Sequence, residues 1–226
     1  MSLAPLVLVV LVLGVGLMIG LALREHGRMR RRRRGLLDAC APMLSDVALR
    51  HGGDDFPMLT GRVNGRALDV RLVSDAMTIR RLPQLWLQVT ALEPLDIGSG
   101  LAALVRPNGS EFYSLTSQFE HTLAAPAAFP PEIIVRGESA QAAHLLDRLA
   151  GAMAAILADP AIKEIAVTRK GLRIVRQAGE GRRGEYLLLR QAVFDAADVP
   201  AADLARILEE IETLSCAVRS AVRVVA

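Results

Sequence analysis

The order of hydrophobic and polar positions divides the chain into an apolar beginning and a long mixed remainder. Residues 3–23 contain no charged side chain, and residues 6–13 are all Leu or Val. As a helix, these 21 residues would span roughly 31 Å at about 1.5 Å per residue, close to the bilayer hydrocarbon thickness of about 30 Å. The pattern therefore predicts a single N-terminal transmembrane helix over residues 1–23.

A cleaved signal peptide is the alternative interpretation of this segment. Such a peptide needs basic residues before its apolar run and small residues at its cleavage site. Residues 1–5 carry no Lys or Arg, and the apolar run ends in Leu-Ala-Leu-Arg at positions 21–24. The sequence therefore favours an anchor that is not cleaved.

Two glycines, Gly16 and Gly20, stand four residues apart inside the predicted anchor. Small residues at this spacing let two transmembrane helices approach closely. We expect these glycines to form a helix-packing face, through which the chain could form a homodimer. The alternative is that they only reflect the high frequency of glycine in such helices.

The clearest pattern in the remainder is a β-hairpin around Asn64-Gly65. Both residues of this turn need positive φ, which Asn and Gly adopt most easily. A two-residue loop pairs Val63 with Arg66 and Leu59 with Val70. This register separates an apolar face from a polar face, namely Leu59, Val63, Leu68, Val70 and Leu72 from Thr60, Arg62, Asp69 and Arg71.

Periodicity and turn residues predict the other elements of the first half. Residues 36–50 have helical spacing, interrupted at Pro42, and residues 85–92 alternate as a strand. Residues 101–106 and 111–115 flank Pro107-Asn108-Gly109 as a second hairpin. The predicted divisions are a basic juxtamembrane segment over 24–35, a β-rich subdomain over 36–123 and a Pro- and Ala-rich connection over 124–131.

The second half, residues 132–226, is predicted to be an α+β subdomain. Its expected elements are a strand over 132–136, a helix from a Ser139 cap to Leu157, a hairpin of 162–169 and 172–177, a strand over 186–194 and a helix from Pro200. Hairpins dominate, and strands do not alternate with helices. The predicted fold class is therefore α+β: a single N-terminal transmembrane helix followed by a mostly antiparallel, hairpin-rich soluble domain with two or three helices.

Positive charge is concentrated next to the predicted anchor. The chain has a net charge of +3, yet residues 24–34 alone hold seven Arg and one Glu, and the rest holds 20 basic and 23 acidic residues. Such a segment either contacts anionic lipid headgroups or serves only as a topology signal. The predicted membrane-surface residues are Arg24, Arg28, Arg30, Arg31, Arg32, Arg33 and Arg34.

Loops rich in Lys and Arg stay on the cytoplasmic side of a membrane. We therefore expect a single-pass protein of the bacterial inner (plasma) membrane, with its N-terminus outside and its folded domain in the cytoplasm. The expected partners are the lipid bilayer and one or more membrane proteins. Nucleic acid is excluded, because the arginines lie against the membrane and have no aromatic residues interleaved for base stacking.

Cysteine and lysine usage bear on compartment and origin. Cys40 and Cys216 are the only cysteines, and they form no CxxC motif or disulfide framework, which fits a reducing compartment. Lys163 and Lys170 are the only lysines, whereas Arg and Ala are abundant. This bias indicates a GC-rich bacterial genome.

The most suggestive catalytic pattern is Ser139, between a predicted strand and a predicted helix, with His51-Gly52-Gly53 upstream. A nucleophile elbow has its Ser at such a turn, and an HGG segment can supply oxyanion donors. That fold also needs an acid and then a His after the Ser. Because His144 follows without an intervening acid, the sequence favours Ser139 as a helix cap.

Other motifs are weaker still. Residues 179–184 match GxGxxG, but a strand is predicted after them, whereas a dinucleotide site needs a helix there. The four His residues are scattered and lack metal-ligand spacing. Cys40 lies in an apolar stripe and is predicted to be a core thiol. The sequence therefore predicts no catalytic residue, no cofactor and no metal site.

The leading hypothesis is a non-catalytic, membrane-anchored accessory or scaffold protein, a subunit or assembly factor of a membrane protein complex. It rests on the anchor, the basic segment and the lack of a surviving catalytic motif. A membrane-tethered enzyme with a site assembled from distant residues remains an alternative, as does a small-ligand or lipid-binding module. A pocket lined by ionisable groups with shifted pKa values would favour the enzyme.

Overall fold

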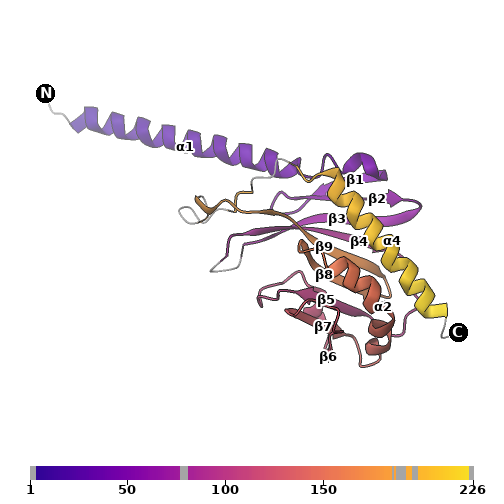
Figure 1. Cartoon of the computed structure of the whole chain (residues 1–226). Helices are drawn as coiled ribbons and strands as arrows, with labels where there is room; N and C mark the ends of the chain where they lie inside the picture. Colours follow the sequence, from indigo (N-terminus) through magenta and orange to yellow (C-terminus); the bar gives the residue numbers. More distant parts are fainter. Residues whose placement is uncertain (1–3, 77–80, 185, 187–191, 195–197, 224–226) are drawn as a thin grey trace.

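An antiparallel sheet runs through the described part of the chain (Figure 1). The computed structural model describes residues 4–76, 81–184, 186, 192–194 and 198–223. Within these residues, nine strands pair in the order β1-β2-β3-β4-β9-β8-β5-β7-β6. The helices α1, α2 and α4 complete an α+β fold that is mostly antiparallel, as predicted.

The first four strands follow one another across the sheet. They are β1 (Ser45–His51), β2 (Pro57–Val63), β3 (Arg66–Asp75) and β4 (Gln84–Leu92). Asn64 and Gly65 have φ values of 51° and 79°, as their turn requires. Val63 pairs with Arg66 and Leu59 with Val70, so the predicted hairpin register is confirmed. The predicted strand over 85–92 is confirmed as β4.

The remaining strands are β5 (Leu101–Val105), β6 (His121–Leu123), β7 (Ile133–Gly137), β8 (Ile162–Thr168) and β9 (Gly171–Glu180). The predicted β8–β9 hairpin and the strand at β7 are confirmed. β9 also pairs with β4 over nearly its whole length. Strands from the predicted subdomains 36–123 and 132–226 therefore belong to one continuous sheet.

Two helices cover one face of the sheet (Figure 1). They are α2 (Ala142–Leu157) and α4 (Ala201–Arg223), which pack against each other and confirm the two predicted amphipathic helices. Their buried side chains meet alternate residues of the central strands in one core. Representative members are Leu146, Met153, Ile207, Leu214, Leu87, Val89, Ile165 and Ile174.

Residues 35–44 join the N-terminal helix α1 (Ala4–Arg34) to this core through turns and the short 3-10 helix η1 (Ala41–Met43). Leu36 and Leu37 are buried, and the backbone N–H of Val199 donates to the Leu36 carbonyl at 2.7 Å. Cys40 is fully buried, which confirms it as a core thiol, and burial raises the pKa of this thiol to about 11. The end of α1 is therefore continuous with the core.

The predicted helix over residues 36–50 is wrong. Leu37, Cys40 and Leu44 are buried at their helical spacing, but the chain turns at Pro42 and continues as β1. β1 pairs with β2 through Leu49–Leu59 and Arg50–Met58. Pairing with a strand ten residues away therefore overrides the local periodicity of this segment.

Two further local predictions are wrong. Residues 111–115 are not a strand, and β5 pairs instead with β7 and β8. Ser139 does not cap α2 with its side chain, because its hydroxyl donates to Ser99 Oγ at 2.9 Å. The predicted strand over 186–194 falls mostly outside the described residues.

The predicted transmembrane anchor requires a correction. α1 is continuous, and its described side chains are those of Leu8 and of residues 11–34. In the part of the chain that the structure describes, no helix has both the length and the apolarity to cross a membrane. This finding contradicts the predicted localisation as a single-pass inner-membrane protein.

Gly171 begins β9 at a position that only glycine fits. Its φ is +143°, and a Cβ there would lie 1.9 Å from the carbonyl oxygen of Ala91 on β4. We expect Gly171→Ala to lower the free energy of unfolding by at least about 1–3 kcal/mol, because the backbone strain adds to this clash. Urea unfolding of the full chain measures the change.

Gly151 is the matched control for this substitution, since it lies within α2 and a Cβ there would meet nothing within 4 Å. Gly151→Ala should leave the free energy of unfolding unchanged or raise it by about 0.5–1 kcal/mol, because Ala favours a helix interior. Equal effects of the two substitutions would contradict this account of the β4–β9 contact.

Candidate functional site

The sheet face opposite the helices carries a loop rather than a third helix. Residues 106–120 connect β5 to β6 and pack over this face. Trp86, Tyr113 and Val175 form one apolar contact, and Ala102, Phe119 and Ala166 form another. We call residues 106–120 the covering loop. It covers charged residues whose burial the sequence analysis did not predict.

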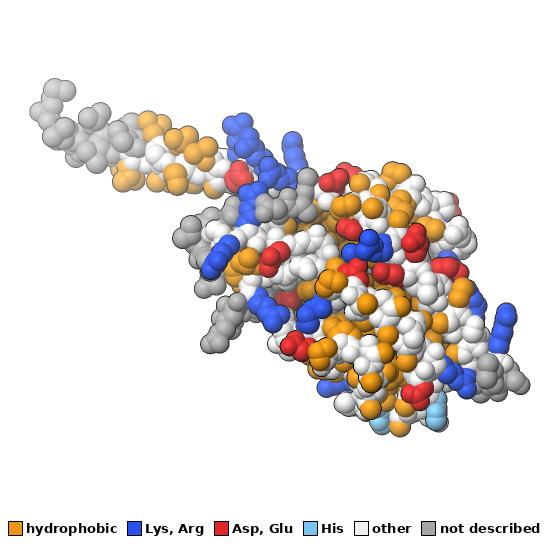
Figure 2. Space-filling model, in the orientation of Figure 1, with side chains coloured by type: hydrophobic (Ala, Val, Ile, Leu, Met, Phe, Trp, Pro, Cys, Tyr) orange, Lys and Arg blue, Asp and Glu red, His pale blue; other side chains and the backbone are white. Residues whose placement is uncertain are grey.

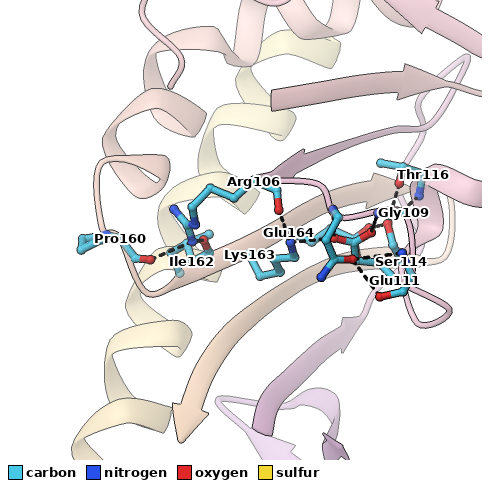
Figure 3. Close-up of polar contacts among 11 residues, drawn as sticks. Arg106, Gly109, Glu111, Ser114, Thr116, Pro160, Ile162, Lys163 and Glu164 are labelled. Atoms are coloured by element: carbon cyan, nitrogen blue, oxygen red, sulfur yellow. Dashed lines mark hydrogen bonds and ion pairs between the residues drawn. The ribbon is translucent and has the colours of Figure 1, made fainter. Parts of the chain in front are cut away.

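A buried ion pair joins the covering loop to β8 (Figure 3). The Lys163 ammonium donates to a Glu111 carboxylate oxygen at 2.8 Å and to the carbonyl oxygen of Arg106 at 2.7 Å. The side chains of Lys163 and Glu111 are only 3% and 4% exposed, respectively. Removing one partner would leave the other charge buried and uncompensated.

The Glu111 carboxylate also organises the start of the loop. It accepts hydrogen bonds from the backbone N–H groups of Asn108 and Gly109 at 2.7 and 2.9 Å. Burial acts to raise the pKa of Glu111, but the bonds from Lys163 and the backbone hold this pKa below its ordinary value. Burial lowers the pKa of Lys163, and the hydrogen bond to Glu111 opposes that shift.

Glu164, the next residue on β8, holds the middle of the covering loop. Its Oε1 accepts from the Ser114 hydroxyl at 2.5 Å and from the Leu115 backbone N–H at 2.8 Å. Its Oε2 is buried without a hydrogen-bond partner among the described residues. Burial raises the pKa of Glu164 above its ordinary value, and the hydrogen bond from Ser114 opposes that shift. Burial therefore shifts the equilibrium of this carboxyl toward its neutral form.

A β-bulge explains how both charged side chains reach the same loop. The β8–β9 register shifts between Ile162 and Glu164. Lys163 Nζ lies 5.8 Å from the ring centroid of Trp86, which faces the covering loop, and Glu164 bonds that loop directly. The extra residue therefore turns two successive side chains to the loop face.

Arg106 closes the cluster at the end of β5. Its guanidinium donates to the carbonyl oxygens of Pro160 and Ile162, both at 2.8 Å, and its φ is +47° (Figure 3). The left-handed backbone lets the chain turn from β5 into the covering loop. Arg106, Glu111, Lys163 and Glu164 together tie this loop to the α2–β8 turn and to β8.

The chemistry available to this cluster is limited by its hydrogen bonds. Ser114 and Glu164 are within proton-transfer distance, but Ser114 is 1% exposed. A general base must also be ionised and reach the proton of a substrate group. The burial of Glu164 and Ser114 and their closed contact with Leu115 oppose that role, because no substrate group can reach them. The arrangement supports holding the covering loop in place.

The predicted membrane-surface arginines lie along the last turns of α1. Three of them contact the domain: Arg30 and Arg34 bind the Asp55 carboxylate at 2.6 and 2.8 Å, and Arg33 lies 5.1 Å from the Phe56 ring centroid. The hydrogen bonds from Arg30 and Arg34 lower the pKa of Asp55 to about 2. This part of the basic segment therefore fixes the direction of α1. Gly16 and Gly20 lie farther along α1 and contact no other part of the described chain.

The other residues considered from sequence do not form a site. His51 ends β1, at one edge of the sheet, whereas Ser139 follows β7, near the opposite edge. His144 is exposed on α2. In the GxGxxG segment, β9 ends at Glu180 and Gly181 forms an isolated bridge with Phe194, while residues 185 and 187–191 beyond the segment lie outside the described part of the chain. Among the residues described, no three His, Cys, Asp or Glu side chains are placed to hold a metal ion.

The buried ionisable residues were missed by the sequence analysis. Lys163 and Glu164 are adjacent charges inside the otherwise apolar run Ile162–Val167. In a central strand, such residues must find partners, so their presence there is a usable signal. Their partners, Glu111 and Ser114, lie about 50 residues earlier in the chain, with separations of 52 and 50 residues. No local spacing rule connects them.

Comparison with protein-family models, with curated proteins and with solved structures found no significant match to this chain.

The Lys163–Glu111 pair can be tested by removing its charges one at a time. Lys163→Met should lower the free energy of unfolding by about 3–5 kcal/mol, because it leaves a buried carboxylate unpaired. Adding Glu111→Gln should recover much of that loss, since Gln is neutral and its amide oxygen can still accept one of the two backbone hydrogen bonds. Urea unfolding of both variants measures the difference, and a double variant as unstable as Lys163→Met alone would contradict it.

Glu164 should make the folded protein less stable as pH rises. A carboxyl with a raised pKa binds its proton more tightly in the folded state, so its stabilisation is complete below the ordinary pKa of 4.5 and is lost as pH rises toward the folded value. Glu164→Gln is neutral throughout and should reduce the fall in the free energy of unfolding as pH rises above 4.5, measured by urea unfolding over a pH series.

Glu210 on α4 provides the comparison for this pH experiment. Burial raises its pKa to about 7, so it titrates in the same direction, but it lies among Arg176, Asp159 and Arg206 on the helix face. Glu210→Gln should remove the part of the fall in the free energy of unfolding with pH that ends near pH 7. An unchanged slope in Glu164→Gln would mean that Glu164 is already ionised in the folded protein.

Proposed function

We propose that this chain is a non-catalytic accessory or scaffold protein, a subunit or assembly factor of a larger protein complex. The observation that carries the proposal is the uncovered apolar surface of α1. The large apolar side chains between Leu11 and Leu23 are 51–69% exposed. Figure 2 shows them along the described part of α1, outside the folded domain.

Uncovered apolar side chains on this scale favour a partner that buries them. At about 25 cal/mol per Å² of apolar surface removed from water, covering even one side of such a helix stabilises a complex by several kcal/mol. The apolar residues extend around the helix rather than along one stripe, since Leu11, Val12, Leu13 and Val15 are all exposed. This distribution supports insertion among several apolar surfaces of a partner.

The base of α1 supports the same proposal. The paired arginines at Asp55 and the buried residues Leu36 and Leu37 connect α1 firmly to the domain. A partner bound along α1 is therefore held at a defined position relative to the sheet. Such coupling suits a protein that positions another subunit.

The competing enzyme function has weaker support. The ionisable groups with shifted pKa values around Lys163 and Glu164 are engaged in holding the covering loop. Their hydrogen bonds leave no free nucleophile–base pair among the residues involved. The scaffold proposal needs no such pair.

The proposal predicts a specific partner along α1. A photo-cross-linking amino acid at Leu17 in the full chain, expressed in the cells that make it, should link to one protein in high yield. The same group at Thr213, exposed on α4, should not link to that protein. Tagged purification and mass spectrometry identify the product. Linkage at Leu17 to no protein would contradict the proposal, and linkage only to a second copy would limit it to self-association.

Leucine substitutions show whether the partner packs closely on the glycine face. A side chain at Gly16, Gly20 or Gly27 would meet nothing within 4 Å in this chain, so none of these changes should disturb its own fold. Gly16→Leu with Gly20→Leu should reduce the Leu17 cross-link, whereas Gly27→Leu, nearer the domain, serves as the control. Equal yields in all three proteins would exclude a role for these glycines.

A further inference from the structure

A cavity of about 550 Å³ opens beside the covering loop. It lies between this loop and the outer face of β5 and β7, with residues of all three in its wall. This volume is within the range of about 300–1,000 Å³ typical of small-molecule sites. The apolar part of its wall includes Leu104, Ile134 and Phe112. The Phe112 ring is 59% exposed, so it is accessible to a ligand in the cavity.

Arg136 on β7 supplies the positive charge of this cavity. It pairs with Ala102 of β5 and Thr122 of β6, which places its side chain on the face of the covering loop. Its Nη1 donates to the carbonyl oxygens of Thr116 and Phe119 at 3.4 and 3.5 Å, near the outer limit for a hydrogen bond. These contacts orient the guanidinium without neutralising it.

The hydrogen-bonding capacity of Arg136 is not filled by the described residues. Its Nε is buried and has no acceptor, and none of the ion pairs among those residues involves it. A buried donor without an acceptor costs about 1–3 kcal/mol, and more when it is charged. Nη2 makes no hydrogen bond among the described residues and is not buried, so an anion in the cavity can accept from it, and a guanidinium matches the two oxygens of a carboxylate or phosphate.

The other polar groups of the wall are already engaged. Glu111 is neutralised by Lys163 and accepts two backbone hydrogen bonds. The Ser110 hydroxyl donates to Asn108, and the Ser117 hydroxyl donates to the Ser114 carbonyl. Arg136 is therefore the group in this wall with both charge and donors to offer a ligand.

We propose that this cavity binds a small organic oxyanion, a carboxylate or a phosphate ester on an apolar or aromatic body, with Arg136 binding the anion. The apolar body lies against Leu104, Ile134 and Phe112. The covering loop, held by its buried ion pair, forms the opposite wall. The site is distinct from α1 and does not depend on the partner proposed for that helix.

Calorimetric titration of the full chain with benzoate and with phenyl phosphate tests this site, with benzyl alcohol as the neutral probe. One or both anions should bind saturably, and benzyl alcohol should bind at least about tenfold more weakly, because it lacks the charge-assisted bonds to Arg136. The tighter of the two anions identifies the oxyanion class. No saturable binding of either anion would overturn the proposal.

Two variants locate the binding in this cavity. Arg136→Gln should weaken anion binding by about tenfold or more, and Arg62→Gln, an exposed arginine on β2, should leave it unchanged. Ile134→Trp fills the cavity while keeping its charge, so it should also abolish binding and carries the test if Arg136→Gln fails to fold. Undiminished binding in Ile134→Trp, or in a folded Arg136→Gln, would place the anion elsewhere and reject the site.

Discussion

The pairing of β4 with β9 is the contact on which the rest of the structure depends. It runs from Gln84–Glu180 to Leu92–Gly171 and joins the β1–β4 meander to every later strand. Because it makes these strands central, both faces of the sheet must be covered. One face is covered by α2 and α4, and the other by the covering loop.

Covering a sheet with a loop creates a polar problem that a helix does not. A loop brings backbone N–H and C=O groups that have no regular partners, and these groups must be satisfied when they are buried. Lys163 and Glu111 form hydrogen bonds with backbone groups at the start of the covering loop. Glu164 accepts a hydrogen bond from a backbone N–H group near the middle of this loop. The buried charges are therefore a consequence of covering this face with a loop. The bulge in β8 lets one short strand segment provide two of them, Lys163 and Glu164.

Local patterns predicted the elements that local contacts decide. The Asn64-Gly65 turn fixed its own register, and the stripes of α2 and α4 could be read from spacing alone. The helix predicted over residues 36–50 was wrong because the apolar spacing suits a helix, whereas β1 forms backbone hydrogen bonds with the neighbouring strand β2. The strand predicted over residues 111–115 was wrong because this segment hydrogen-bonds to the Glu164 side chain of β8, far along the chain, rather than to a neighbouring strand.

The candidate sites could not be predicted from local patterns either, because their residues are also brought together from distant parts of the sequence. Arg136 is one arginine among many in the sequence, and only the pairing of β7 with β5 and β6 brings it to a cavity wall whose one carboxylate, Glu111, is already paired with Lys163. The basic segment could be recognised from the sequence. Its contact with Asp55 could not, because this acid lies 21 residues after Arg34. The anchor prediction relied on an uncharged apolar run, and no helix in the described part of the chain combines the length and the apolarity to cross a membrane.

The distance along the chain between β4 and β9 also shapes how this protein must be made. Roughly 80 residues separate Leu92 from Gly171, so at about 5–20 residues per second a ribosome adds them in about 4–16 seconds. During that interval β4 is complete, yet the strand that belongs beside it does not exist. Its Leu85, Leu87 and Val89 side chains, fully buried in the finished fold, then depend on a chaperone or on transient contacts within the nascent chain.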